Sequence, residues 1–234
     1  MDSQRYTRHF SLPEIGEAGQ RKLAAAKILC IGAGGLASPA LLYLAAAGLG
    51  TIGIVDDDVV ALSNLQRQIL HSTDTLAQKK TTSARESIHR LNPDVCVHLH
   101  DERFMPDNAA ALAAGYDILI DASDNFAARY LCGDVCRELR IPDIYGSVEG
   151  FCGQLTVFAP QPGAPTYRDL FPAGQEEEPV AGVLGMVPGI IGTLQAIEAV
   201  KLILGIGTPL IGQMLHFNAL TMHFRKIAIG VRGE

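Results

Sequence analysis

A glycine-rich loop between two apolar runs is the part of this sequence best suited to hold a phosphate group. The run 27–31 leads into Gly32, Gly34 and Gly35, and with Ala37 the loop has the spacing Gly-x-Gly-x-x-Ala. Glycine permits a tight turn, and because it has no Cβ the backbone can approach a phosphate closely. A helix beginning here would add free N–H groups and the positive end of its dipole. The pattern predicts a nucleotide-binding turn, with a tight βα turn without ligand as the alternative.

Asp56 stands where such a unit places its acidic residue. A second apolar run, residues 51–55, ends immediately before it. A carboxylate at the end of that strand can accept hydrogen bonds from the ribose hydroxyls. Loop, helix and acid together predict a βαβ unit that binds a nucleotide.

A polar and cationic cluster follows, which an ordinary dinucleotide-binding unit does not need. Asn64, Arg67 and Gln68 come after the second strand, Lys80 opens the next helix, and Asp124 lies just past a later short strand. The carboxyl ends of parallel strands share one edge of an open sheet, and ligands bind at that edge. We therefore expect these side chains to converge on the glycine loop.

The chemistry that suits this cluster is attack on the α-phosphate of ATP. Arg67 and Lys80 can neutralise the charge that builds on the phosphate oxygens, and Asn64 can donate a hydrogen bond. Asp124 can hold Mg²⁺ through one carboxylate, because this metal usually keeps several waters and phosphate oxygens as ligands. In the alternative interpretation each residue is a surface charge or a helix cap, and Asp124 is an N-cap.

The order of expected elements is that of an α/β domain with a doubly wound, mostly parallel, Rossmann-like sheet and additional C-terminal strands. One domain is expected over residues 1–234, with an N-terminal helical segment (1–26) and a mobile, crossover-type loop (160–181). The expected strands cover 27–31, 51–55, 95–100, 118–121, 141–147, 154–158, 214–218 and 223–229. The expected helices cover 11–26, 36–47, 75–91, 106–114, 125–139 and 187–204.

Composition narrows the class of protein. A chain of 234 residues can form one large α/β domain but has little room for a separate substrate domain. The net charge of −6 argues against a nucleic-acid binder, which needs a basic face. The polar first residues predict no signal peptide, and the most apolar stretch, 36–49, is too short to span a membrane. The 5 cysteines without dense spacing indicate reduced thiols and a cytoplasmic location.

These motifs resemble those of the bacterial E1-like (ubiquitin-activating) adenylyltransferases of the ThiF, MoeB and HesA type. The resemblance includes the glycine loop and covers nearly the whole chain, and such a set of motifs in this order is highly specific. The matching segments are Arg5-Tyr-Thr-Arg8-His, Asp56-Asp-Asp58, Leu62-Ser-Asn64-Leu-Gln-Arg67-Gln68, Lys80, Asn92-Pro93, Asp121-Ala-Ser-Asp124-Asn125, Gly182-Val-Leu-Gly185 and Gln195-Ala-Ile-Glu198-Ala.

The resemblance implies a reaction and a protein partner. The C-terminal glycine carboxylate of a ubiquitin-fold sulfur-carrier protein, ThiS- or MoaD-like and ending in Gly-Gly, attacks the α-phosphate of Mg-ATP. An acyl-adenylate forms and pyrophosphate leaves, in thiamine or molybdopterin cofactor biosynthesis. The family also implies that Gly34 lies in the phosphate loop, that Asp56 binds ribose, and that Asn64, Arg67 and Lys80 contact phosphates. It further implies that Asp124 carries the magnesium, that Arg8 reaches the nucleotide of the other subunit of a homodimer, and that the late loop lies over the carrier's tail.

The chain departs from the family pattern at two places. Zinc-bearing members have two Cys-x-x-Cys pairs, but Thr166 and Asp169 stand where the first pair would fall, and no second pair follows the last strand. Four-thiolate zinc needs all of its ligands, so no structural zinc is expected. The family's loop cysteine would lie close to Glu178, yet no cysteine occurs after Cys152. A thioester or persulfide on that loop is therefore not available, whereas adenylation requires no thiol.

Two other functions fit parts of the pattern. The glycine fingerprint alone allows an NAD-dependent oxidoreductase, although the cationic loop and the lack of a substrate domain argue against it. The missing cysteines allow a non-catalytic relative that holds nucleotide or carrier without turnover, although the ATP-site residues are all present. His71, which follows the Arg67 cluster, could touch a phosphate, but loop surface is the favoured interpretation.

Overall fold

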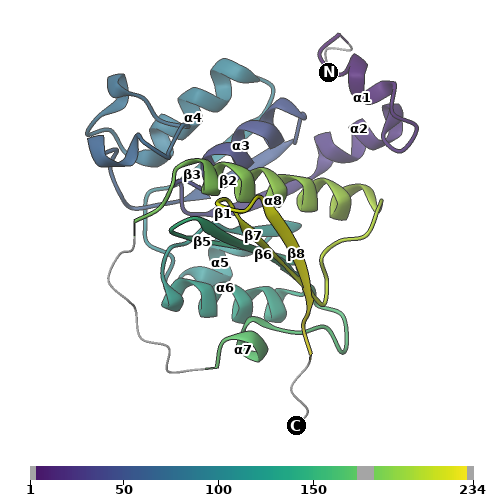
Figure 1. Ribbon diagram of the computed structural model, residues 1–234. Helices are drawn as coiled ribbons and strands as arrows, with labels where there is room; N and C mark the ends of the chain where they lie inside the picture. Colours follow the sequence, from purple (N-terminus) through teal and green to yellow (C-terminus); the bar gives the residue numbers. More distant parts are fainter. Residues whose placement is uncertain (1–3, 173–181, 231–234) are drawn as a thin grey trace.

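The fold is one twisted sheet with helices on both faces. The computed structural model describes residues 4–172 and 182–230 (Figure 1). The sheet has eight strands in the order β3-β2-β1-β4-β5-β6-β7-β8. The parallel part consists of β3 (Cys96–His100), β2 (Thr51–Val55), β1 (Lys27–Ile31), β4 (Ile118–Asp121) and β5 (Asp143–Glu149). The antiparallel part consists of β6 (Cys152–Phe158), β7 (Gln213–Asn218) and β8 (His223–Ala228). The predicted fold class is confirmed.

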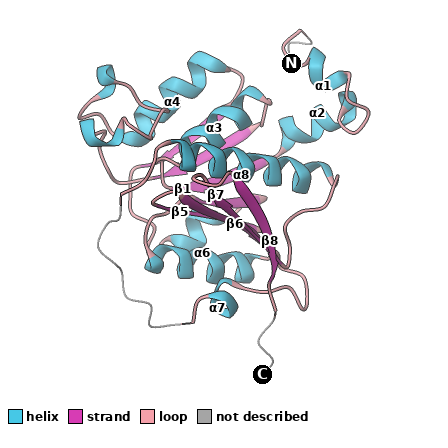
Figure 2. Cartoon of the chain, viewed as in Figure 1, coloured by secondary structure: helices cyan, strands magenta, loops and turns pink. Residues whose placement is uncertain are grey.

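The helices form two layers that bury the sheet between them (Figure 2). One apolar core joins the sheet to α3 (Ala37–Ala46), α4 (Lys80–Leu91) and α8 (Met186–Leu204). A second core, on the opposite face, joins it to α5 (Ala109–Ala113) and α6 (Phe126–Leu139). The short α7 (Tyr167–Leu170) packs outside α6 over an aromatic cluster. At the N-terminus α1 (Thr7–Phe10) and α2 (Gly16–Ala25) pack on each other, and α2 reaches α8.

The strand order reverses at β1, and this reversal creates the place for a ligand. β1 lies between β2 and β4, and the chain reaches these two neighbours by crossovers on opposite sides of it. At its carboxyl end Gly32 has φ +95, and a Cβ there would lie 2.9 Å from the carbonyl oxygen of Ala122. The turns after β1 and β4 therefore touch at the switch point of the sheet, where open α/β sheets bind ligands.

Two predicted helices have the wrong bounds. The helix expected over 11–26 begins only at Gly16, because residues 11–15 include Pro13 and Gly16 has φ +52, a left-handed conformation, and α1 is a separate helix that ends before residue 11. The helix expected from 75 begins at Lys80 instead, since Ala77 has φ 65 and the backbone of Lys79 bridges to Val59. Residues 73–75 form a separate 3-10 turn, η2 (Thr73–Thr75).

The loop expected over 160–181 contains a helix that periodicity did not reveal. α7 begins where the backbone N–H and Oγ1 of Thr166 both donate to Oδ2 of Asp169, each at 2.7 Å. This capping pattern starts a helix of a single turn, too short for an apolar period. The mobility expected for the loop, and Glu178 within it, concern residues 173–181, which lie outside the described part of the chain.

By length and composition α8 resembles a membrane-spanning helix, with a mean hydropathy of 1.5. Its contacts explain this composition, because it packs against α3 and lies across β5 and β6 as a core helix.

We predict that Gly192→Ala destabilises the fold whereas Gly189→Ala, on the same helix, does not. A Cβ at Gly192 would collide with the backbone carbonyl of Leu36, so α8 and α3 would have to separate. Overpacking of this kind costs about 1–3 kcal/mol. A Cβ at Gly189 meets nothing within 4 Å, and alanine there favours the helix by roughly 1 kcal/mol. Urea unfolding of both variants measures the difference, and equal free energies of unfolding would contradict the packing described.

Candidate nucleotide-binding site

The turn after β1 is held by side chains at the two successive peptide groups that flank Ala33. The N–H of Ala33 donates to Oδ2 of Asp56 at 2.7 Å, and its C=O accepts from Nε2 of His71 at 2.8 Å. The other Asp56 oxygen accepts from the N–H of Asp58 at 2.9 Å. Within the described residues the N–H groups of Gly34 and Gly35, just before α3, have no hydrogen-bond partner. These groups and the helix end behind them suit an anion.

Arg67 and Gln68 lie against the glycines, as the sequence predicted. A Cβ on Gly35 would lie 3.4 Å from Cγ of Arg67, and one on Gly34 would lie 3.6 Å from Nε2 of Gln68. Gln68 is only 5% exposed, and its Oε1 is buried without a partner. Arg67 donates from Nη1 to the carbonyl of Ser63 at 3.2 Å, which aligns its guanidinium along the loop.

Asn64 shapes the loop that carries these side chains. It ends the 3-10 turn η1 (Leu62–Asn64), and its Oδ1 accepts from the N–H of Ala61 at 3.0 Å. The side-chain nitrogen of Asn64 is therefore the part left to donate to a ligand, the role that the sequence predicted.

Lys80 is a buried cation held by the acids after β2. Its side chain is 8% exposed, and Nζ lies 2.7 Å from Oδ2 of Asp58 and 4.0 Å from Oδ1 of Asp56. Asp56 thus contacts both the glycine loop and the neighbourhood of Lys80. The charge of Lys80 is shared with these two carboxylates, so it offsets part of their repulsion of a phosphate at the turn.

Asp124 is exposed and does not cap the helix that follows it. The N-cap of α6 is Asn125, whose Oδ1 accepts from the N–H of Ala128 at 2.9 Å. Asp124 accepts one long hydrogen bond, from Nδ2 of Asn125 at 3.4 Å. The capping interpretation of Asp124 is therefore wrong, and its carboxylate is available to a cation.

The strand end beneath Asp124 is fixed by buried polar groups. Oδ1 of Asp121 accepts from the N–H and the Oγ of Ser123, at 3.0 and 2.6 Å. Nε2 of Gln195, from α8, donates to the carbonyls of Asp121 and Ile144 at 2.8 and 2.9 Å. On the other side Nη2 of Arg129 donates to the carbonyl of Ser123 at 3.4 Å. Sequence reasoning did not identify this support, because glutamine and arginine on helices give no signal of what they contact.

Asp121 and Asp143 are fully buried acids with unusual titration. Oδ2 of Asp121 and both carboxyl oxygens of Asp143 have no hydrogen-bond partner among residues 4–172 and 182–230. Burial, and after it the charge of Asp121, raises the pKa of Asp143 well above its usual range. Burial also raises the pKa of Asp121, although hydrogen bonds from Ser123 and the charge of Arg129 oppose it. Asp143 is therefore protonated over a pH range where an exposed aspartate is ionised.

The structure does not bring Arg8 to the glycine loop of its own chain. Arg8 is exposed on α1, and α1 packs on α2. The helix is nevertheless firmly placed, because Tyr6 at its start is buried and its hydroxyl accepts from Nδ2 of Asn92 at 2.9 Å. Participation of Arg8 in a site therefore requires a second subunit.

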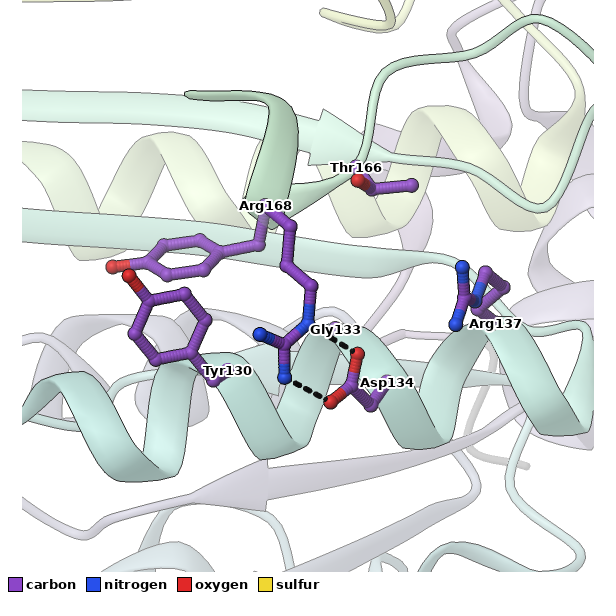
Figure 3. A pocket seen from close by; sticks show the side chains of 7 residues that line it. Tyr130, Gly133, Asp134, Arg137, Thr166 and Arg168 are labelled. Carbon is purple, nitrogen blue, oxygen red and sulfur yellow. Dashed lines mark hydrogen bonds and ion pairs between the residues drawn. The ribbon is translucent and has the colours of Figure 1, made fainter. Parts of the chain in front are cut away.

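Thr166, one of the two residues at the zinc-ligand positions, lines a small pocket between α6 and α7 (Figure 3). Thr166 and Asp169 cap α7 as described above. The guanidinium of Arg168 donates to both carboxylate oxygens of Asp134, at 3.0 and 2.5 Å, and lies 4.9 Å from the centre of the Tyr130 ring (Figure 3). Hydrogen bonds and an ion pair thus tie this segment to α6.

Fold and site together define a nucleotide-binding, doubly wound α/β protein, and comparison with known proteins gives its family. The ThiF family model matches residues 6–232. A probable molybdopterin-synthase adenylyltransferase of Porphyra purpurea is 46% identical over 231 residues, which are 96% of this chain and 60% of that protein. The SAMP-activating enzyme E1 of Haloferax volcanii is 44% identical over 228 residues, 95% of this chain and 84% of that protein. The chain therefore belongs to the ThiF family, and the predicted membership of this E1-like group is confirmed.

Several of the curated relatives are longer than this chain. It spans 60% of the Porphyra protein, 59% of a probable adenylyltransferase/sulfurtransferase MoeZ of Mycobacterium tuberculosis and 48% of a Zea mays relative. Among solved structures, E. coli MccB with ATP has a TM-score of 0.85 at 20% identity, covering 99% of this chain and 73% of that one. PaaA has a TM-score of 0.81 at 23% identity, covering 97% of this chain and 73% of that one. These two structures share the fold.

We predict that Asp124→Ala leaves the free energy of unfolding nearly unchanged whereas Asn125→Ala lowers it. Asn125 satisfies a helix N–H and Asp124 does not, and loss of an N-cap costs about 1 kcal/mol. Thermal unfolding of the two variants measures the difference. Destabilisation by Asp124→Ala equal to that by Asn125→Ala would restore the capping interpretation.

We also predict a pH-dependent gain in stability for Asp143→Asn. Because the folded pKa of Asp143 is raised, the native protein binds a proton that the unfolded chain has released. Stability of the parent protein should therefore fall as pH rises above about 4, by at most about 1.4 kcal/mol per pH unit from this group. The variant lacks this loss, so its advantage should grow from pH 4 to pH 7 in urea unfolding.

Asp134→Asn is a control whose effect on the free energy of unfolding should change with pH in the opposite direction. The hydrogen bond from Arg168 is the main cause that lowers the pKa of Asp134. The carboxylate therefore contributes stability above its unfolded pKa, and this contribution is lost as pH falls through the folded value. A constant difference between Asp143→Asn and the parent across this range would show that Asp143 titrates normally.

Proposed function

We propose that this protein is an ATP-dependent adenylyltransferase that activates the C-terminal glycine of a ubiquitin-fold sulfur-carrier protein. The observation that carries the proposal is the set of groups around one turn. The free N–H groups of Gly34 and Gly35 have Arg67 and Gln68 against them, and Lys80 lies buried beside Asp56 behind them. A dinucleotide site needs the glycine turn and the acid but no such group of cations.

The proposed reaction is displacement at the α-phosphorus of ATP. An oxygen of the carrier's terminal carboxylate forms the new bond to phosphorus, the bond to the bridging oxygen breaks, and pyrophosphate leaves. Arg67 and Lys80 offset the charge that develops on the phosphate oxygens, and the side-chain nitrogen of Asn64 donates to one of them. Asp56, whose carboxylate faces the turn, accepts from the ribose. Most of the rate enhancement then comes from positioning and electrostatics, as in other phosphoryl transfers.

Asp124 fits the single protein ligand that a nucleotide-bound Mg²⁺ needs. Its carboxylate is exposed at the switch point, and the described residues contain no cluster of three or more metal-ligating side chains. Hard oxygen donors suit this ion, which takes its other ligands from water and phosphates. When bound, the ion would add positive charge at the phosphates that Arg67 and Lys80 also face. We propose no structural zinc, because Thr166 and Asp169 are engaged in capping α7.

The relatives support a carrier protein as the substrate. One is named a molybdopterin-synthase adenylyltransferase and another a SAMP-activating enzyme. We propose thiamine or molybdopterin cofactor biosynthesis as the context, with a carrier that ends in Gly-Gly. The segment at Val183 and Leu184, whose backbone pairs with Gly150, would border the carrier's tail.

We further propose a cytoplasmic homodimer in which Arg8 completes the partner's site. An exposed arginine on a fixed helix away from its own glycine loop is what such an arrangement requires. The 5 cysteines, all in the described part of the chain, are free thiols, as expected in a reducing compartment.

We predict that Lys80→Gln abolishes most ATP–pyrophosphate exchange while Lys79→Gln retains it. Lys80 is buried beside Asp56, whereas the neighbouring Lys79 is exposed and donates from Nζ to the carbonyl of Asp57 at 3.0 Å. Loss of one group that stabilises developing charge lowers kcat by about 100-fold to 1,000-fold. Lys79→Gln should stay within about twofold of the parent, because that charge is solvated.

The exchange is measured with labelled pyrophosphate, a carrier ending in Gly-Gly and the same carrier shortened by its last glycine. Exchange should require the intact carrier terminus. Absence of exchange from folded protein with ThiS-like and MoaD-like carriers alike would refute the proposed activity, and unchanged exchange in Lys80→Gln would refute the role of Lys80.

A further inference from the structure

We propose that His71 is a positioning residue of the nucleotide site, whose imidazole locks the Ala33 peptide so that the turn presents the N–H groups of Gly34 and Gly35. The inference rests on the proposed function in that it assumes a nucleotide at this turn. It adds a residue to the site that neither the motifs nor the expected chemistry assigned.

The geometry of His71 fixes where its protons lie. The ring is buried, Nε2 is 2.8 Å from the carbonyl oxygen of Ala33, and Nδ1 is 2.9 Å from Oγ of Ser83. A carbonyl only accepts, so Nε2 must carry a proton and donate it. Nδ1 of the neutral ring then accepts from the Ser83 hydroxyl. One tautomer satisfies both contacts.

The contacts of His71 extend from the glycine turn to the helix that carries Lys80. Ser83 belongs to α4 and lies one helical turn after Lys80. Its Oγ is also 3.0 Å from Oγ1 of Thr75, and because the Ser83 proton goes to Nδ1, Ser83 accepts here from the Thr75 hydroxyl, for which the carbonyl of Ser72, also at 3.0 Å, is the alternative acceptor. The chain of hydrogen bonds therefore sets the distance between the turn and the first residue of α4.

Burial favours the neutral form of the ring. Burial is the largest cause that lowers the pKa of His71, and the nearby charge of Lys80 lowers it further. The hydrogen bond to Ala33 and the charge of Asp56 act in the opposite direction. Asp56 holds the preceding peptide group through the N–H of Ala33, so the two residues restrain the turn on either side of the Ala33 Cα.

The test compares His71→Ala, His71→Gln and Ser87→Ala. Glutamine can place an N–H near Nε2 of the imidazole and so donate to Ala33. Ser87 is the matched control, because its Oγ donates at 2.6 Å to the carbonyl of Leu70, next to His71, and so ties the same segment to α4 without touching the turn. The dissociation constant of Mg-ATP is measured by calorimetry, and KM for ATP and for the carrier in the exchange assay.

His71→Ala should raise the dissociation constant and KM for ATP at least tenfold and leave KM for the carrier unchanged. His71→Gln should return the dissociation constant and KM for ATP to within about threefold of the parent, because this variant lacks only one hydrogen bond of the parent. Ser87→Ala should lower the melting temperature without changing ATP affinity. Tight ATP binding by folded His71→Ala, or failure of His71→Gln to restore it, would overturn the inference.

Nitrogen NMR of the parent protein gives a readout independent of variants and of activity. The ring should show a protonated Nε2 and an unprotonated Nδ1 at pH 7, and the opposite tautomer would refute the inference even if His71→Ala does not fold. If the parent binds Mg-ATP but shows no exchange, the proposed activity fails while the His71 result still stands.

Discussion

The backbone of Ala33 is the constraint on which the site depends. Its N–H is held by Asp56 and its C=O by His71, so neither end of the turn can rotate without breaking a hydrogen bond in a poorly solvated environment. Asp56 can reach it because β1 and β2 pair in register, with Ile31 opposite Val55. The positive φ of Gly32 then turns the chain toward α3. The glycines after Ala33 are thus the part of the turn whose N–H groups remain for a ligand.

The strand end that leads to Asp124 is supported by buried polar groups at a cost in stability. Asp121, Asp143 and Gln195 bury polar atoms without partners under the strand end that leads to Asp124. An unpartnered buried polar group costs roughly 1–3 kcal/mol, and an ionised one costs more. Raised pKa values are how the carboxyls avoid the larger cost, because the neutral form is easier to bury. Residues that break local rules in this way are common near functional sites.

The segment that contains α7 is held against α6 by side-chain contacts. Arg168 and Asp134 form a two-pronged ion pair on the outside of α6, with Tyr130 beneath the guanidinium. The hydroxyl of Tyr130 in turn donates to the carbonyls of Phe171 and Pro172. These contacts, together with the cap made by Thr166 and Asp169, hold both ends of α7 against α6. Their geometry requires no thiolates at this position.

The sequence by itself determined the nucleotide-binding unit and the family. Strands 27–31, 51–55 and 118–121 occur at their predicted bounds, because buried parallel strands are short apolar runs whose ends are marked by glycine or aspartate. The predicted nearness of Arg67 and Gln68 to the glycine loop followed from parallel topology, which gathers strand ends at one edge. Motif order alone identified the ThiF family.

Only the tertiary structure decided what individual polar side chains contact. His71 was interpreted as surface, yet it is buried against Ala33, a residue 38 positions away in the chain. The start of α4 at Lys80, the late start of α2 at Gly16 and the capping role of Asn125 instead of Asp124 were likewise settled in three dimensions. The physical reason is the same in each case. A hydrogen bond depends on angles and on a few tenths of an ångström, and residue type and spacing along the chain carry no such information.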